Sequence, residues 1–389
     1  MSKEPGIRPT RRRLLTTGVL AGTSAVSFAV GRNLAGSNQT ETVSHVAAGP
    51  ERVSPFGARQ PGITSPSPRQ QNVTVSIFDV LTMAQVPEIL DKLGNIAVDA
   101  IEGGMLADTE PAKLTLTVGV GPRVIREFLS EASPGSQMLP DFQREQFESP
   151  GLKQGDLFIQ LCSDDQMVTS LVQARVEDYL ADKSVKNWSA QGFRGALDNG
   201  AARNLLGFHD GVSVPRGDAE LDDLVWLQEP ERLRGATIAV VRRMPIDVAR
   251  FAALTLEEQE QAVGRRRKNG APLSGGSRED DPNLHSKSPA GEVDIPLGAH
   301  VRRAHPLPSG AKGLMLRRGY SYFNSSDDQG LLFISFQSEL RTFTATQHRM
   351  DELDDLMNFT RTTASGTFLI GPGQTEETKL GDFLRSSAP

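Results

Sequence analysis

The chain has 389 residues, of which 38% are hydrophobic and 23% are charged. These values are ordinary for a globular protein and suffice for one large domain or two fused domains. A formal net charge of −6 excludes the overall basic field of a nucleic-acid-binding protein. The single cysteine, Cys162, excludes both an intramolecular disulfide and a Cys-x-x-Cys-His haem attachment site. We expect it to be a buried small hydrophobic residue.

Residues 1–35 have the composition of an export signal. Arg11, Arg12 and Arg13 precede a mildly apolar stretch at 14–30 that is too short and too weakly hydrophobic to predict a membrane span. This order is typical of a twin-arginine signal, so we expect the twin-arginine export machinery to deliver the chain to the periplasm, cell envelope or exterior. An uncleaved anchor is the alternative. Residues 36–70 lack apolar periodicity and predict a linker.

Residues 71–215 predict an α+β unit, because alternating apolar strands are separated by helices with apolar residues at helical spacing. Ser163 and Gln166 resemble a capping box that opens the second helix. The predicted strands are 73–77, 114–120, 157–161 and 187–193, and the predicted helices are 82–101 and 163–180. The order strand, helix, strand, helical link, strand, helix, strand suits a ferredoxin-like unit with an antiparallel sheet.

Residues 235–385 repeat this pattern after a boundary near 216–234. The predicted strands are 236–242, 314–316, 331–336 and 367–370, the predicted helices are 246–263 and 350–359, and 270–289 is a loop. The sequence therefore predicts an α+β fold of two fused ferredoxin-like halves with antiparallel sheets, arranged like a barrel. The basic run 265–268 is interpreted as a solvated helix end or loop, with a cofactor-facing arginine as the alternative.

Asp210 is the first candidate for chemistry. It follows an apolar run and precedes Gly211, and the glycines around it permit a tight turn. A carboxylate beside apolar residues holds its proton more tightly and suits acid–base catalysis. The amides of Gly211, Val212 and Ser213 can reach an anionic group such as a propionate. An ordinary Asp-Gly turn is the alternative.

His300 and Arg317 are the other candidates. His300 follows an apolar lead-in at 295–299, and of the six histidines it best suits an axial haem ligand, which needs an acceptor at its other nitrogen. A structural role is the alternative. Arg317 and Arg318 adjoin on a strand, so one points inward and the other toward solvent. The inward guanidinium needs an anionic partner, either a ligand or a carboxylate at the edge of the core.

A carboxylate, an imidazole and a guanidinium are the minimum set for a haem peroxidase. The segments that carry them, 204–211, 300–302 and 314–322, resemble the dye-decolourising peroxidases, above all the exported twin-arginine branch linked to iron uptake. The resemblance implies two ferredoxin-like halves and one haem b per chain, held mainly by the C-terminal half.

By motif match, His300 corresponds to the proximal iron ligand, Asp210 to the distal acid–base residue and Arg317 to the distal arginine that stabilises O–O cleavage. Asp354 falls where the family places the carboxylate that holds the proximal histidine, although Asp351, Glu352 and Asp355 are neighbours. The residues implied to line the haem are Gly211, Val212, Ser213, His300, Arg302, His305, Pro306, Leu307 and Arg317.

The implied activity is one-electron oxidation of dyes, phenols or other bulky organic reductants by hydrogen peroxide. Bulky reductants would lose electrons to aromatic residues at the surface, for which Tyr320 and Tyr322 are the first candidates, with core packing as the alternative. A haem-handling protein that releases iron for uptake is the alternative function, and a non-catalytic binding domain is the third. Iron-uptake components and a second copy of the chain are the further partners implied.

Overall fold

The computed structural model describes residues 52–106, 109–195, 197–198, 201–209, 213–306 and 313–385. The predicted signal at 1–35 lies outside these residues, as do Asp210, Gly211, Val212 and Leu307. None of the helices in the described ranges has the length and apolar character needed to span a bilayer.

The N-terminal half contains the four predicted strands and both predicted helices. They are β1 (Asn72–Val80), α1 (Val86–Ile101), β2 (Thr115–Val120), α2 (Pro122–Phe128), β3 (Leu157–Ser163), α3 (Gln166–Leu180) and β4 (Ser184–Phe193), with 3-10 turns η1 (Met83–Gln85) and η2 (Pro150–Leu152). The predicted capping box is wrong, because Asp165 caps α3 by accepting from the Met167 amide. The Ser163 hydroxyl instead donates to the Ala112 carbonyl.

Two short strands and a helix connect the halves, and the C-terminal half follows. The connecting elements are β5 (Leu197–Asp198), β6 (Ala201–Ala202), α4 (Gly217–Leu224) and η3 (Glu231–Leu233). The C-terminal elements are β7 (Thr237–Pro245), α5 (Val248–Ala252), α6 (Leu256–Val263), α7 (His300–Arg303), β8 (Leu316–Arg317), β9 (Tyr320–Ser325), β10 (Asp328–Gln337), α8 (Leu340–Leu353), η4 (Asp355–Phe359), β11 (Ala364–Ile370) and η5 (Asp382–Leu384).

Two predicted C-terminal helices differ from the observed ones. The segment 246–263 is divided into α5 and α6, because Thr255 and Glu258 form a capping box that starts a new helix. The helix predicted at 350–359 begins at Leu340, and η4 replaces its last part. Its start was missed because α8 buries polar residues such as Gln347 and Asp351, which breaks the apolar periodicity.

One antiparallel sheet unites the two halves. Its strand order is β7-β11-β2-β3-β1-β4-β9-β10-β8, and a further pairing of β10 with β7 closes it into a barrel. The halves meet where Leu369 of β11 pairs with Val120 of β2 and where Phe193 of β4 pairs with Ser321 of β9. This arrangement confirms the predicted α+β fold with fused antiparallel halves.

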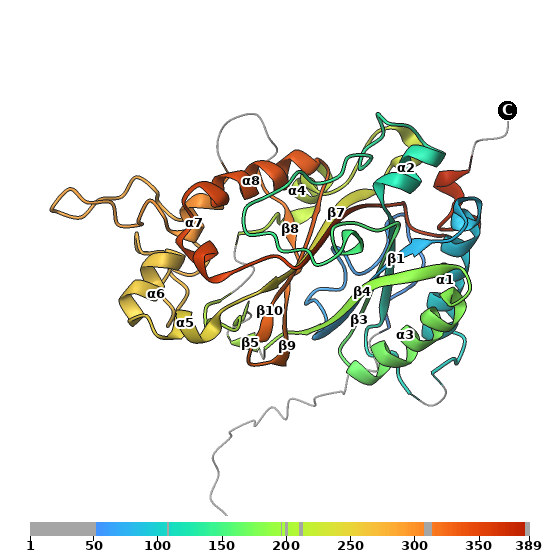
Figure 1. Ribbon diagram of the computed structural model, residues 1–389, viewed down its shortest axis with the longest axis horizontal. Coiled ribbons are helices and arrows are strands. Elements are labelled where there is room, and N and C mark those ends of the chain that lie inside the picture. Colours follow the sequence, from blue (N-terminus) through green and yellow to red (C-terminus); the bar gives the residue numbers. More distant parts are fainter. Residues whose placement is uncertain are drawn as a thin grey trace, which may run out of the picture. The chain divides into compact units, whose positions relative to one another are not determined.

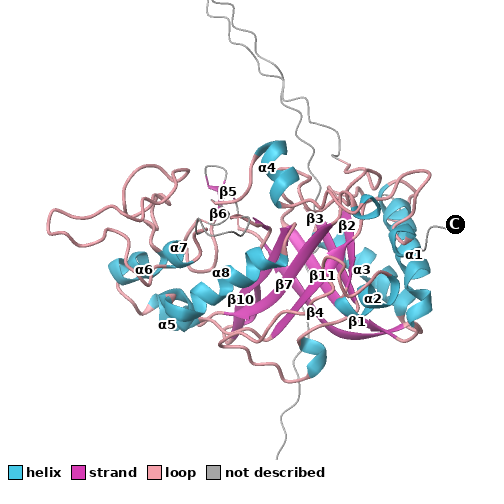
Figure 2. Cartoon of the chain, turned by 90° about the horizontal axis from the view of Figure 1, so that it is seen from above, coloured by secondary structure: helices cyan, strands magenta, loops and turns pink. Residues whose placement is uncertain are grey.

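Both faces of the sheet are covered. Val73, Val75 and Ile77 belong to the apolar cluster inside the barrel, whereas Ser76 on the opposite face accepts a hydrogen bond from Gln173 of α3. Helices α1 and α3 pack together over the N-terminal strands, and α8 contacts β10 (Figures 1 and 2). Burial on both sides explains why every residue of β2 and β3 is buried.

The first described segment is packed into the domain. Residues 52–70 contain no regular helix or strand, as the predicted linker implies. However, Gln60, Ile63 and Gln70 are almost fully buried, so this part of the predicted linker is not a spacer. The sequence missed it because its contacts are hydrogen bonds from irregular backbone, which leave no periodic pattern.

A buried ion pair fastens an irregular segment to β7, and the same arginine also bonds to α8. The Arg242 guanidinium donates to Glu145 Oε1 at 2.6 Å and to Gln347 Oε1 at 2.8 Å. The two charged side chains are only 1% and 9% exposed. Burial raises the pKa of Glu145 and lowers the pKa of Arg242 to about 10, since desolvation disfavours both charges. Each charge therefore depends on the other.

Replacing Glu145 with glutamine removes the carboxylate and leaves a buried guanidinium charge. We expect Glu145→Gln to lower the free energy of unfolding by about 3–5 kcal/mol, measured by denaturant titration. Glu110→Gln is the matched control, because Glu110 pairs with Arg52 where both side chains are more than half exposed, and it should cost less than about 1 kcal/mol. Equal losses for the two variants would contradict this account.

Candidate functional site

His300 and Asp354 come together across 54 residues of sequence. His300 is the first residue of α7, and its Nδ1 lies 2.7 Å from Asp354 Oδ2. The imidazole is 35% exposed, whereas the Asp354 side chain is 0% exposed. The second carboxylate oxygen of Asp354 accepts from the Leu356 amide at 2.9 Å and so caps η4. This carboxylate is held from two directions and fixes the orientation of the ring.

The neighbouring acidic residues have other partners. Asp351 accepts from the Gln143 amide and from Gln347, and Glu352 pairs with Arg303. The Asp355 amide donates to the Gly298 carbonyl at 2.8 Å, which fastens the start of η4 to the residues just before His300. A side chain at Gly298 would collide with the Asp355 carboxylate, so a glycine at 298 lets the two segments approach.

The residues after His300 are bonded to α8 and to the preceding loop. Arg302 donates to the carbonyls of Leu284, Ile295 and Pro296, so its guanidinium organises residues 284–296. His305 Nδ1 lies 2.9 Å from the Pro306 carbonyl oxygen, and the His305 carbonyl accepts from Arg349 of α8. Arg302, His305 and Pro306 thus share one short segment with His300.

The segment that leads to Asp210 is fixed as far as His209. The Asn204 side chain accepts from the Leu206 and Phe208 amides, and Gly207 has a φ of +82°, which favours glycine. Leu206 and Phe208 are buried in an apolar cluster with Phe251. After the undescribed residues, Ser213 is half-buried.

Arg203 and Arg265 organise this region, although no local sequence pattern indicated such a role for them. Arg203 donates to the carbonyls of Gly207, Arg267 and Lys268. Arg265 is 6% exposed and donates to the Gly270 and Arg278 carbonyls, so it is not part of a solvated run. Burial lowers its pKa, as does the nearby charge of Arg317. The glycines at 264 and 270, which both have positive φ, were the available signal for a compact turn.

Arg317 and Arg318 differ in burial, although Arg318 lies beyond the end of β8 and Arg317 does not face solvent as predicted. Arg318 is 4% exposed and donates to the Ile63 carbonyl and to Gln70 Oε1. Arg317 is half-buried, and its backbone pairs with Ser335 of β10. The inward arginine is therefore Arg318, and its observed partners are a carbonyl and an amide instead of an anion.

The aromatic residues proposed as electron exits are not at the surface. Tyr320 and Tyr322 are each 1% exposed inside the barrel, and the Tyr320 hydroxyl contacts the buried Cys162 sulfur at 3.8 Å. Trp188 and Trp226 are also buried. Of the chain's two tryptophans and three tyrosines, Tyr179 of α3 alone is partly exposed. For Tyr320 and Tyr322, the alternative of core packing is therefore correct.

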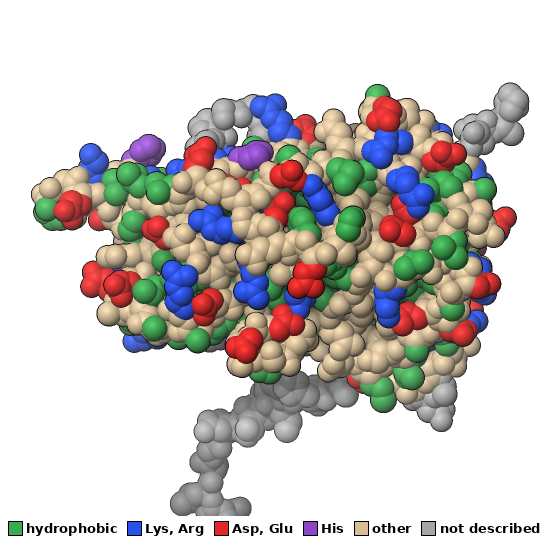
Figure 3. Space-filling model, viewed as in Figure 1, with side chains coloured by type: hydrophobic (Ala, Val, Ile, Leu, Met, Phe, Trp, Pro, Cys, Tyr) green, Lys and Arg blue, Asp and Glu red, His purple; other side chains and the backbone are tan. Residues whose placement is uncertain are grey.

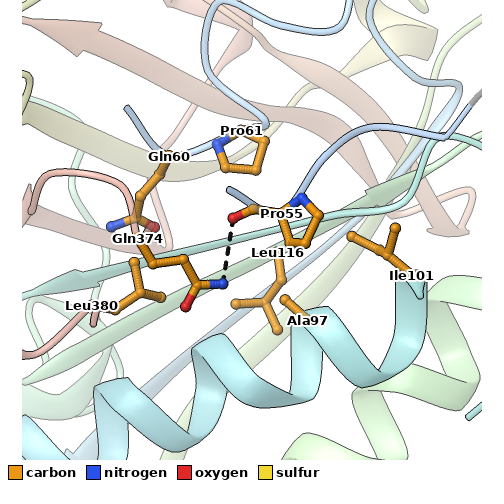
Figure 4. A pocket seen from close by; sticks show the side chains of 8 residues that line it. All are labelled: Pro55, Gln60, Pro61, Ala97, Ile101, Leu116, Gln374 and Leu380. Carbon is orange, nitrogen blue, oxygen red and sulfur yellow. Dashed lines mark hydrogen bonds between the residues drawn. The ribbon is translucent and has the colours of Figure 1, made fainter. Parts of the chain in front are cut away.

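A small pocket lies elsewhere, between α1 and the segment 55–61 (Figure 4). Ala97 and Ile101 of α1 line it together with Leu116 and Leu380, and Gln374 donates across it to the Pro55 carbonyl. It contains none of the predicted site residues.

On the face shown in Figure 3, acidic and basic side chains are interspersed.

Comparison with known proteins gives the family. The family model described as Dyp-type peroxidase, N-terminal, matches residues 60–194, and Dyp-type peroxidase, C-terminal, matches residues 201–375. A dye-decolorizing peroxidase of Thermobifida fusca (strain YX) is 30% identical, with 86% of this chain and 85% of that protein covered. A deferrochelatase of Shigella flexneri serotype 5b (strain 8401) is 30% identical, with 94% of each covered.

Solved structures of similar fold agree with this family assignment. The oxyferrous complex of DtpA from Streptomyces lividans has a TM-score of 0.79 and 29% identity, with 86% of this chain and 98% of that chain covered. A DyP-type peroxidase from Streptomyces coelicolor has a TM-score of 0.78 and 29% identity, with 86% and 97% covered. The chain therefore belongs to the Dyp-type peroxidase family and is an oxidoreductase of the peroxidase class.

Proposed function

We propose that this chain binds one haem b and uses hydrogen peroxide to oxidise phenols, dyes or other organic reductants in one-electron steps. The observation that carries the proposal is the His300–Asp354 pair, an imidazole held at Nδ1 by a fully buried carboxylate. Membership of the peroxidase family supports it, as do the oxyferrous and ferric forms of the similar DtpA.

The residues present suit a haem. His300 offers a single imidazole, which fits an iron whose equatorial ligands come from a porphyrin. Because Nδ1 is engaged by Asp354, the iron would be bound through Nε2. Apolar side chains of Leu206, Phe208 and Leu356 cluster in the same half of the molecule. When bound, the haem would supply the electrons that cleave the O–O bond of peroxide.

The protein would contribute a proton shuttle and two electrostatic effects. Asp210 would accept the proton from the inner oxygen of hydrogen peroxide and return it to the outer oxygen, which leaves as water. Arg317 would stabilise the charge that develops on the departing oxygen. Asp354, by accepting from Nδ1–H, would make the imidazole of His300 a stronger electron donor. The reductant would then deliver two electrons, one at a time.

Substitutions of Asp354 and of the adjacent Asp355 should affect peroxidase activity differently. Asp354→Asn removes the negative charge at Nδ1, and we expect peroxidase activity to fall about 10- to 100-fold, measured as steady-state turnover per bound haem. Asp355→Asn is the matched control, because the neighbouring carboxylate has no hydrogen bond to His300 in the described part of the chain, and it should keep near wild-type turnover. Equal activity of the two variants would refute the assignment of Asp354.

A second substitution tests the proton shuttle. Asp210→Asn should retain the haem absorbance but slow the reaction with peroxide about 10²- to 10⁴-fold, measured by stopped-flow absorbance. Asp218→Asn, at an exposed carboxylate of α4, is the control and should react like the wild type. An Asp210→Asn variant with full activity would mean that another group carries the proton.

Release of iron from haem is the second candidate function, because several relatives at 28–30% identity are named deferrochelatase. The same His300–Asp354 pair would hold haem in either case. A protein that only carries haem has no use for a proton shuttle, so the Asp210→Asn experiment separates the two functions. Iron-free porphyrin produced equally by the wild type and Asp210→Asn would favour iron release.

We also infer that the twin-arginine machinery exports the chain, which is supported by Arg11–Arg13 and the mildly apolar stretch after them. Replacing Arg11, Arg12 and Arg13 together by lysine should retain the protein in the cytoplasm, measured by cell fractionation and immunoblotting. Arg8→Lys is the control and should leave export unchanged. Unchanged export of the triple variant would exclude this pathway.

A further inference from the structure

Arg317 lies in a strand with little support of its own. β8 contains only Leu316 and Arg317, and it forms the end of the strand order, paired with β10 at Ser335 and Phe336. β8 has only β10 as a hydrogen-bonded strand neighbour, so its other side must be restrained by other groups or remain mobile. The position of the Arg317 main chain depends on that restraint.

The restraint comes from the segment 61–70, which we call the strap. Arg69 Nη1 donates to the Arg317 carbonyl at 3.1 Å, on the main chain of the residue whose side chain is in question. The Arg69 carbonyl in turn accepts from Arg194 Nη1 at 3.3 Å, just after β4. Arg69 therefore links β8 of the C-terminal half to the N-terminal half.

Arg318 provides the second link from β8 to the strap. Its guanidinium donates to the Ile63 carbonyl and to Gln70 Oε1, both at 2.9 Å, and its amide donates to the Ile334 carbonyl. In the described part of the chain no carboxylate accepts from it. Burying a guanidinium that is 4% exposed with only neutral acceptors costs free energy of folding. Such costly arrangements are expected at functional sites.

The strap itself is anchored to strands of the N-terminal half. The Thr117 hydroxyl donates to the Pro61 carbonyl at 2.6 Å, and Gln160 donates to the Gly62 carbonyl at 3.0 Å. Gln70 donates to Thr115 Oγ1 at 3.0 Å. Gly62 has a φ of +89°, and a side chain there would collide with Thr117. These anchors on β2 and β3 make the strap a rigid support.

We propose that the strap is a positioning element for peroxide activation, in which Arg69 and Arg318 hold β8 so that the Arg317 guanidinium is aimed at the distal side of the haem. This proposal rests on the function proposed for Arg317 above. Electrostatic stabilisation of a departing oxygen requires a donor placed within a fraction of an ångström, and a displacement of about 1 Å can cost about 100-fold in rate. Arg69 and Arg318 are thus positioning residues, not catalytic ones.

The test uses the full-length protein loaded with haem and replaces Arg69. Arg69→Met removes the donor to the Arg317 carbonyl, and we expect the second-order rate constant for hydrogen peroxide to fall about 10- to 100-fold. Fluoride affinity of the ferric protein, titrated by absorbance, should fall in parallel, because a guanidinium stabilises a bound anion. The KM for a phenol reductant should be unchanged.

Three further variants make the outcome decisive. Arg69→Lys keeps a cationic donor and should recover much of the rate, and Arg194→Met, which releases the Arg69 carbonyl, should show a smaller loss of the same kind. Arg52→Met is the control, because Arg52 is an exposed residue before the strap, and it should match the wild type. Thermal unfolding of each variant shows whether a loss of rate reflects unfolding. The rate constants of all variants are compared at a temperature at which every variant is folded.

Arg317→Met separates this proposal from the function on which it rests. If Arg317→Met reacts with peroxide and binds fluoride like the wild type, the role proposed for Arg317 is wrong. If Arg317→Met is slow but folded Arg69→Met and Arg194→Met both behave like the wild type, the strap proposal is overturned while the proposed function stands. Parallel losses in Arg69→Met and Arg317→Met support the strap.

Discussion

The Asp354 carboxylate is fully buried, and a buried charge persists only where hydrogen-bond donors meet it. Its two donors come from separate places in the chain. The Leu356 amide belongs to the turn after α8, and the His300 imidazole belongs to α7. The hydrogen bonds that the Asp354 carboxylate accepts therefore bring together α7 and the end of α8. The Asp355–Gly298 backbone hydrogen bond holds the two segments at this distance.

The barrel places the two candidate sides of the site on one scaffold. β10 pairs with β7, β8 and β9, so the strand next to Arg317 also closes the barrel. α8, which ends just before Asp354, follows β10 and contacts it. Arg317 thus pairs with β10 close to the start of α8, and Asp354 follows the last residue of α8. The strap, which is bonded to β2 and β3 of the N-terminal half, reaches β8 through its hydrogen bond to the Arg317 carbonyl.

The sequence revealed those elements whose burial is periodic. The strands at 73–77 and 157–161 were predictable because their apolar residues alternate. The start of α8 was not, since its buried face holds Gln347, which accepts from Arg242, and Asp351, which accepts from Gln347. The strap was also missed, because its buried groups are backbone carbonyls and the side chains of Gln60 and Gln70. Polar burial depends on partners far away in sequence, which a local pattern does not contain.

The site residues were proposed from motifs and not from spacing. Nothing in the local sequence distinguishes Asp354 from Asp351 or Asp355, whereas in the structure Asp354 contacts His300. The pattern of adjacent arginines predicted one inward and one solvent-facing side chain; Arg318 is buried, whereas Arg317 is half-buried and not fully exposed to solvent. The pattern did not predict that the buried Arg318 would donate to neutral acceptors, because these acceptors belong to the strap, which is far from Arg318 in the sequence.

If this chain is a haem peroxidase, as we propose, His300 binds the iron. The most direct measurement is the visible absorption spectrum of the purified, haem-loaded protein before and after one equivalent of hydrogen peroxide. We expect a Soret band that shifts on addition of peroxide and returns when a phenol is added, and that is lost in His300→Ala. A Soret band that does not respond to peroxide, or that survives unchanged in His300→Ala, would contradict it.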